Sequence, residues 1–152
     1  MSTMDEKIRK AMEIIHEHMR GSDIRWILVG STHMALEGMA VAPNDLDVAT
    51  SYDDLMRIPV LFPEYTFSDI SPLKNGAGGG KMQTRIEGTE VEFMGEPAQG
   101  IYTKRMDQGI RYLTFDGMDL PVLSLEAEAG AYEEMGRDHK ARMIYDFLSK
   151  ER

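Results

Sequence analysis

Two aspartates at alternate positions, Asp45 and Asp47, are the residues of this chain best suited to hold a metal ion. In an extended strand, side chains at i and i+2 point to the same face, so both carboxylates would lie together while Leu46 and Val48 face the core. Two neighbouring carboxylates repel each other unless a cation lies between them. Because Mg²⁺ prefers hard oxygen ligands, the pair predicts a site for Mg²⁺, or for Mn²⁺. The alternative is a solvated strand face that holds no metal.

The turn at Gly30 and Ser31 is the second feature with chemical potential. An apolar run, 26–29, ends at this turn, and a short helix-like segment follows it. The N-terminus of a helix presents backbone N–H groups to an anion, and its dipole favours negative charge. The turn therefore predicts a phosphate-binding site, to which Ser31 adds a hydroxyl. His33, one turn further on, could touch the same ligand. The alternative is an ordinary strand-to-helix turn in which Ser31 caps the helix.

Gly30, Ser31, Asp45 and Asp47 together resemble the signature of the polymerase-β-like nucleotidyltransferase superfamily. That signature places Gly-Ser on a tight turn and Asp-x-Asp on the next strand. The resemblance covers residues 24–94 and is to the small proteins of the abortive-infection and minimal nucleotidyltransferase type. It implies that the turn holds the phosphates of an NTP and that the two aspartates hold Mg²⁺ against them.

The resemblance also implies a third acid further along the chain, and Glu92 is the residue that fits. The family usually has Asp there. Val91 and Phe93 alternate with Glu90 and Glu92, so both glutamates would share one face of a strand. The implied role of Glu92 is that of a general base, which takes the proton from an attacking hydroxyl, with Glu90 as the second choice. The alternative is a surface acid on a hairpin.

Three basic residues are further candidates for binding the nucleotide. Lys81 follows the Gly76–Gly80 loop, which would either fold over phosphates as a lid or simply connect two strands. Arg137 and Lys140 lie at the start of the last expected helix. Their segment resembles the Arg-x-x-Lys-Asp segment of abortive-infection-type nucleotidyltransferases, with Ala141 in place of the acid. A solvated helix face is the alternative for these two residues.

The composition limits the classes of protein that need consideration. The 152 residues are 42% hydrophobic and 28% charged, as is typical of one globular domain. The absence of cysteine excludes disulfides and thiolate metal sites. We find no secretory signal and no apolar run of membrane-spanning length, and therefore expect a cytoplasmic protein that does not contact a membrane. The net charge of −9 disfavours binding to duplex nucleic acid.

The hydrophobic periodicity predicts an α+β fold with a nucleotidyltransferase-like mixed β-sheet flanked by helices, in a single domain at 1–152. The core, about 24–123, is expected to contain strands at 24–29, 46–49, 82–86 and 90–94 and a hairpin at 110–122. Helices are expected at 4–19, 32–38 and 51–58. A C-terminal helical pair is expected at about 124–150, with Gly136 ending the first helix of the pair.

These features predict a nucleotidyltransferase that moves a nucleoside monophosphate from a Mg²⁺-bound NTP to a hydroxyl group and releases pyrophosphate. The acceptor is expected to be a small molecule, such as an antibiotic, or a protein side chain. The alternative is a binding or regulatory module of the same fold without turnover, which pairs with a protein partner as in toxin–antitoxin modules. Glu92 in the third acidic position favours this alternative. A homodimer is compatible with either function.

Overall fold

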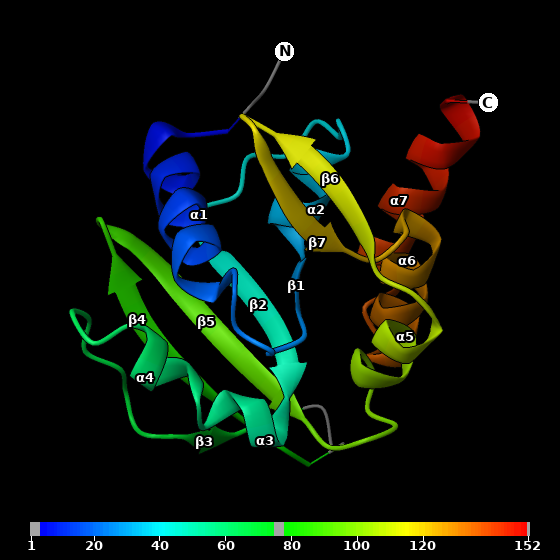
Figure 1. Ribbon diagram of the computed structural model, residues 1–152. Coiled ribbons are helices and arrows are strands. Elements are labelled where there is room, and N and C mark those ends of the chain that lie inside the picture. The colour runs from blue at the N-terminus through cyan, green and yellow to red at the C-terminus, as the bar shows by residue number, and fades with distance from the viewer. Residues whose placement is uncertain (1–3, 75–77, 152) are drawn as a thin grey trace.

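The computed structural model describes residues 4–74 and 78–151, which contain a five-stranded mixed sheet (Figure 1). The strand order is β1-β2-β5-β4-β3. Strand β2 runs parallel to β5, and all other neighbours in the sheet are antiparallel. The expected α+β fold with a mixed sheet is therefore confirmed. The strands are β1 (Trp26–Val29), β2 (Leu46–Ser51), β3 (Ser71–Pro72), β4 (Gly80–Ile86) and β5 (Thr89–Glu96).

Helices and a separate two-stranded sheet complete the described part of the chain. The two-stranded sheet is formed by β6 (Arg111–Phe115) and β7 (Met118–Val122). The C-terminal helices α6 and α7 pack against each other at one side of the main sheet, as the sequence predicted (Figure 1). Within the described ranges, none of the helices has the length and apolar composition needed to cross a membrane. The helices are α1 (Glu6–Met19), α2 (Ser31–Leu36), α3 (Tyr52–Leu55), α4 (Ile58–Leu61), α5 (Thr103–Gln108), α6 (Leu125–Glu134) and α7 (Asp138–Lys150).

The alternation of side chains along β1 and β2 divides the core into two parts. Leu46 and Val48 are buried on one face of the sheet, where they pack with residues of α1 and β7. Val29 and Ala49 are buried on the other face, together with residues of α5 and α6. Because side chains two positions apart share a face, Asp47 lies on the second face, with Ala49. The fold thus turns this aspartate toward the C-terminal helices.

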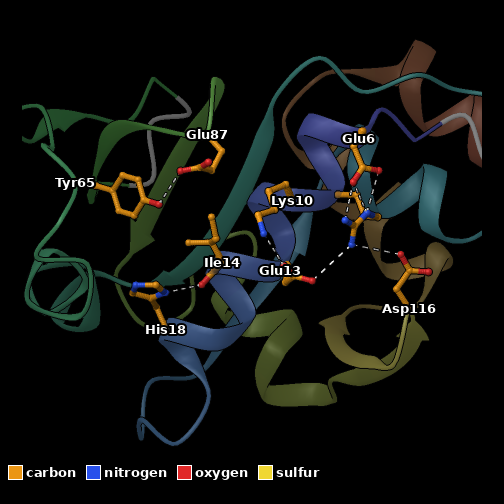
Figure 2. Close-up of polar contacts among 9 residues, drawn as sticks. Glu6, Lys10, Glu13, Ile14, His18, Tyr65, Glu87 and Asp116 are labelled. Atoms are coloured by element: carbon orange, nitrogen blue, oxygen red, sulfur yellow. Dashed lines mark hydrogen bonds and ion pairs between the residues drawn. The ribbon is translucent and has the colours of Figure 1, made fainter.

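Helix α1 lies over the first face, and its polar side chains form contacts within the helix and one with the β6–β7 turn (Figure 2). Arg9 pairs with Glu6 at 2.6 Å and reaches Asp116, in the β6–β7 turn, at 3.7 Å. At the other end of the helix, Nδ1 of His18 lies 2.8 Å from the carbonyl oxygen of Ile14. Exposed ion pairs contribute little individually, so the buried apolar face of α1 provides most of its stabilisation.

The glycine-rich segment is not the free loop that the sequence predicted. Residues 75–77 lie outside the described residues, but Gly80 already belongs to β4 and pairs with Gly95 of β5. A Cβ atom on Gly79 would lie only 2.2 Å from the carbonyl oxygen of Gly95. Glycine is needed here because the backbones of two segments approach each other closely. The prediction of a lid is therefore wrong for Gly79 and Gly80.

Two helices and one strand between residues 52 and 110 were not predicted. Instead of one helix at 51–58, the chain forms α3 and then α4, which carries Pro59 in its first turn, where a missing N–H costs nothing. Helix α5 begins where the carboxylate of Glu96 accepts hydrogen bonds from the N–H groups of Tyr102 (2.6 Å) and Thr103 (3.0 Å). Because the capping residue lies six and seven positions before these groups, the usual local capping pattern is absent.

Replacing Gly79 by Ala should destabilise the protein far more than replacing Gly117 by Ala. Both glycines have positive φ (+87° and +78°), so the free energy of unfolding of both variants should fall by about 1–2 kcal/mol because of backbone strain. Gly79 alone has a backbone oxygen at the Cβ position, which adds a further loss of about 1–3 kcal/mol. Urea unfolding of both variants measures the difference. Equal losses would show that the contact between Gly79 and Gly95 is not tight.

Candidate active site

Asp47 lies within a row of residues that crosses four neighbouring strands. It is opposite Val29 on β1 and opposite Glu92 on β5. Gln83 of β4 continues the row beyond Glu92. Residues that are opposite each other in register share a face of the sheet, so Asp47 and Glu92 are direct neighbours. The parallel pairing of β2 with β5 therefore brings together two of the three acids that the sequence singled out.

Asp45 lies in the bend just before β2, not inside the strand. The hydroxyl of Thr32, on α2, donates a hydrogen bond to the carbonyl oxygen of Asp45 (3.1 Å) and so holds the bend against that helix. Asp45, Asp47 and Glu92 line the same small cavity of about 50 Å³. The predicted acids thus meet at one place, and Thr32 is a positioning residue that the sequence analysis did not identify. Glu90 also lines this cavity.

The turn at Gly30 lies directly against the carboxylate of Asp47. Gly30 has φ +76°, and a Cβ atom there would lie 3.3 Å from Oδ2 of Asp47. Gly30 is the N-cap residue of α2, and Ser31 is the first residue of the helix, so Ser31 is not the cap. Within the described residues, the Ser31 hydroxyl forms no hydrogen bond. The first turn of α2 and the Ser31 hydroxyl are therefore available to a ligand beside Asp47.

The electrostatic environment of Asp47 is strongly unfavourable for a negative charge. Burial, followed by the charges of Asp45 and Glu92, raises the pKa of Asp47 to about 7. The carboxylate of Glu128 adds to this rise in the pKa, and the guanidinium of Arg137 opposes it. A cation bound at this position would relieve the repulsion.

Asp45 and Asp47 are the candidate metal ligands. Across 4–74 and 78–151, no three Asp, Glu, His or Cys side chains converge closely enough to hold a metal ion by themselves. Two hard carboxylates suit Mg²⁺ when other oxygens complete its coordination, and Mg²⁺ commonly takes these from water and from substrate phosphates. The donor set therefore fits Mg²⁺ as a two-carboxylate site.

Glu92 is held by two residues of β4. Nζ of Lys81 lies 3.6 Å from Oε1 of Glu92, and the side-chain amide of Gln83 donates a hydrogen bond to the same oxygen (3.1 Å). Lys81 is thus next to the acids, but its charge faces Glu92. Glu90 pairs instead with Arg85, on the exposed side of the hairpin. Of the two glutamates, Glu92 is the one in register with Asp47.

Of the two basic residues predicted at the start of α7, the structure brings only Arg137 to the acids. Its guanidinium carbon lies 5.8 Å from the centre of the Tyr132 ring, and its charge acts on Asp47. Lys140, in the first turn of α7, forms no side-chain hydrogen bond or ion pair in the part of the chain that the structure describes. A phosphate-binding role therefore has geometric support for Arg137 and none for Lys140.

A buried network of charged and polar side chains lies behind the turn. His33 is fully buried, with Nδ1 2.6 Å from Oε1 of Glu128 and Nε2 2.9 Å from Oε2 of Glu37. Tyr102 donates a hydrogen bond to Oε2 of Glu128 (2.7 Å), and Arg111 donates one to Glu37 (2.8 Å). Both ring nitrogens of His33 are therefore occupied. The expectation that His33 touches a ligand is wrong.

The hydrogen bonds of the network favour the charged form of His33. Burial alone would lower the pKa of His33, but the hydrogen bonds with Glu128 and Glu37 outweigh it, and the pKa is raised. The contact between His33 and Glu128 links α2 to α6 across 95 positions of the chain. Glu128 was not predicted from the sequence. Its only sequence signal is an acid on the buried, Ala-rich face of the expected helix.

The comparisons with known proteins identify one family. The family model described as aminoglycoside-2''-adenylyltransferase matches residues 11–148, which include all the candidate site residues. No curated protein matches the chain.

Three solved structures share the fold. Protein TM1012 of Thermotoga maritima, assigned as a nucleotidyltransferase, has a TM-score of 0.74 and 23% identity over 98% of this chain and 97% of that one. The lincosamide antibiotic adenylyltransferase LnuA, solved with lincomycin bound, has a TM-score of 0.54 and 13% identity over 93% and 98%. An antigenic nucleotidyltransferase-like protein from Paracoccidioides brasiliensis has a TM-score of 0.56 and 15% identity over 95% and 75%.

Replacing Asp47 by Asn should stabilise the metal-free protein, and the gain should grow with pH. The pKa of Asp47 rises from 3.8 to about 7 on folding, so the folded state binds this proton more tightly than the unfolded state. The stability of the parent protein therefore falls as the pH rises from about 4 to about 7, and the Asn variant lacks this loss. We expect a gain of about 1–3 kcal/mol near pH 8 and almost none near pH 4, allowing for partial solvent screening.

Urea unfolding in the presence of a chelator measures this gain. Asp69→Asn is the matched control, because Asp69 is exposed and its carboxylate has no partner among the described residues. The control should change stability little at either pH. A gain in the Asp47 variant that does not depend on pH would contradict the electrostatic explanation.

Proposed function

The chain belongs to the aminoglycoside-2''-adenylyltransferase family and is thus a nucleotidyltransferase, and we propose that it transfers adenylate from ATP to a hydroxyl group of a cationic small molecule. Membership of this family confirms the resemblance to polymerase-β-like nucleotidyltransferases. The observation that best supports the proposal is that the turn at Gly30, Asp47 and Glu92 lie next to one another. The turn at Gly30 lies against Asp47, and Glu92 is the neighbour of Asp47 in the sheet.

The nucleotide would bind through the turn and the two aspartates. The free hydroxyl of Ser31 and the amide groups at the start of α2 are donors for phosphate oxygens. Arg137 adds a positive charge on the same side of the site. Asp45 and Asp47 would hold Mg²⁺, or Mn²⁺, which when bound neutralises negative charge on the phosphates.

The transfer step needs a base, and Glu92 is the candidate. Glu92 would take the proton of the acceptor hydroxyl while the hydroxyl oxygen forms a bond to the α-phosphorus. The bond from the α-phosphorus to the bridging oxygen breaks, and pyrophosphate leaves with that electron pair. The contribution of the protein to this step is mainly positioning and the placement of charge.

A cationic acceptor suits the charge of this protein. The chain has a net charge of −9, and the side chains of Glu90 and Asp45 are exposed beside Asp47. Amino sugars, the acceptor class in the name of the family, carry ammonium groups that such a surface attracts. An NTP as substrate also fits the cytoplasmic location that the sequence predicts.

One observation favours a second candidate, a binding module without turnover. Lys81 and Gln83 both contact Oε1 of Glu92. This oxygen is therefore occupied by groups of the protein itself, and an acceptor hydroxyl would have to compete with them. A module of this kind would bind nucleotide and pair with a protein partner or a second copy of the chain.

Replacing Glu92 by Gln should abolish transfer and leave nucleotide binding nearly intact. Asp45 and Asp47 remain to hold the metal ion, so we expect the Kd for Mg²⁺–ATP to change by no more than a few fold. The rate of pyrophosphate release with an aminoglycoside acceptor should fall by roughly 10²–10⁴-fold, the usual contribution of a general base. Calorimetric titration and a pyrophosphate assay measure the two effects separately.

Glu90→Gln is the control, because it makes the same chemical change on the same cavity but at a residue paired with Arg85. It should have a much milder effect. A Glu92 variant as active as the parent would remove Glu92 from the reaction. A parent protein that binds Mg²⁺–ATP but releases no pyrophosphate with any acceptor would support the binding module instead.

A further inference from the structure

Tyr132, on α6, places its hydroxyl at the turn that borders the acids. The side chain is 3% exposed. The position that a Cβ atom on Gly30 would take is 3.7 Å from the Tyr132 hydroxyl and 3.3 Å from Oδ2 of Asp47. The hydroxyl and the carboxylate therefore both lie close to the same side of this glycine, although Tyr132 comes from a helix about a hundred residues further along the chain.

The Tyr132 hydroxyl has no hydrogen-bond partner among the residues that the structure describes. Among residues 4–74 and 78–151 it forms no hydrogen bond, whereas the hydroxyl of the equally buried Tyr102 donates to Glu128 at 2.7 Å. In the same part of the chain, no side-chain nitrogen or oxygen is both fully buried and without a partner. The Tyr132 oxygen therefore still reaches the solvent, although the rest of its side chain is covered. Buried tyrosine hydroxyls usually find a partner, so this one is free to meet a ligand.

The surroundings keep this hydroxyl a donor. Burial and the nearby charge of Glu128 raise the pKa of Tyr132, so the phenol retains its proton at neutral pH. The guanidinium carbon of Arg137 lies 5.8 Å from the ring centre. A protonated phenol beside an arginine can donate to an anion and profits from the positive charge next to it.

We propose that the Tyr132 hydroxyl binds a phosphate oxygen of the nucleotide, between the turn at Gly30 and the Arg137 side chain. This inference rests on the proposed function and adds a binding residue from α6. A phosphate group lying against Gly30 and Ser31 would also be close to the Tyr132 hydroxyl, which lies next to Gly30. Tyr132 and Arg137 would then complete the phosphate site from the C-terminal helices.

The Tyr132→Phe variant tests the proposal. Because no hydrogen bond within the described residues is lost, its melting temperature should stay within about 1 °C of the parent value. Its Kd for Mg²⁺–ATP should rise roughly 10- to 100-fold, as expected for the loss of a hydrogen bond to a charged acceptor. Its Kd for adenosine should stay unchanged, since adenosine has no phosphate.

Tyr102→Phe is the matched control. It removes the hydroxyl of a tyrosine that is equally buried but bonded to Glu128, so its melting temperature should fall while its Kd for Mg²⁺–ATP stays near the parent value. A Tyr132→Phe variant with the parent Kd for Mg²⁺–ATP would overturn the inference alone. An equal rise in the Kd of this variant for adenosine would overturn it as well, because the contact would then be with the nucleoside. A parent protein that binds no Mg²⁺–ATP would overturn the proposed function together with the inference.

Discussion

The half-buried carboxylate of Asp47 is the constraint around which the other parts of the site are arranged. It lies on a central strand, with Glu92 beside it and Asp45 two residues away, and burial and these charges raise its pKa to about 7. Glycine at position 30 adopts the positive φ of the turn, and a Cβ atom there would lie only 3.3 Å from Oδ2 of Asp47. In the metal-free protein this arrangement is electrostatically unfavourable, so the fold must provide compensating stability elsewhere.

The buried network around His33 leaves its own polar groups paired. The His33 ring lies between the carboxylates of Glu128 and Glu37, and Tyr102 donates a hydrogen bond to the other oxygen of Glu128. Breaking a buried pair is costly because it leaves an uncompensated charge, and in the described residues no fully buried polar side-chain atom lacks a partner. Because His33 of α2 contacts Glu128 of α6, this contact also joins the turn to the helix that carries Tyr132. The C-terminal helices are thus structurally part of the site.

The sequence alone predicted the α+β fold, the strands that carry Asp47 and Glu92 and the face on which these two acids lie, whereas Asp45 lies in the bend before its expected strand. The alternation of Asp47 with Leu46 and Val48 is sufficient for this, because side-chain direction in a strand follows from local backbone geometry. The turn at Gly30 was also predicted from a local pattern, because an apolar strand that ends at a glycine and is followed by a helix can be recognised in the sequence. Helix α5 was missed because Glu96, six positions before the capped amide, caps it.

Only the tertiary structure decided which of these residues meet. The pairing of β2 with β5 puts Glu92 beside Asp47, and the contact between Glu128 and His33 spans 95 positions of the chain. The sequence contains the residue types, but no local pattern in it predicts the register of the paired strands or the partners of these side chains. Those depend on how the helices and strands pack, because contacts between distant segments form only when the whole core is assembled. The acids were therefore determined by the sequence, whereas the positions of Tyr132 and Arg137 beside them were determined by the packing of the C-terminal helices.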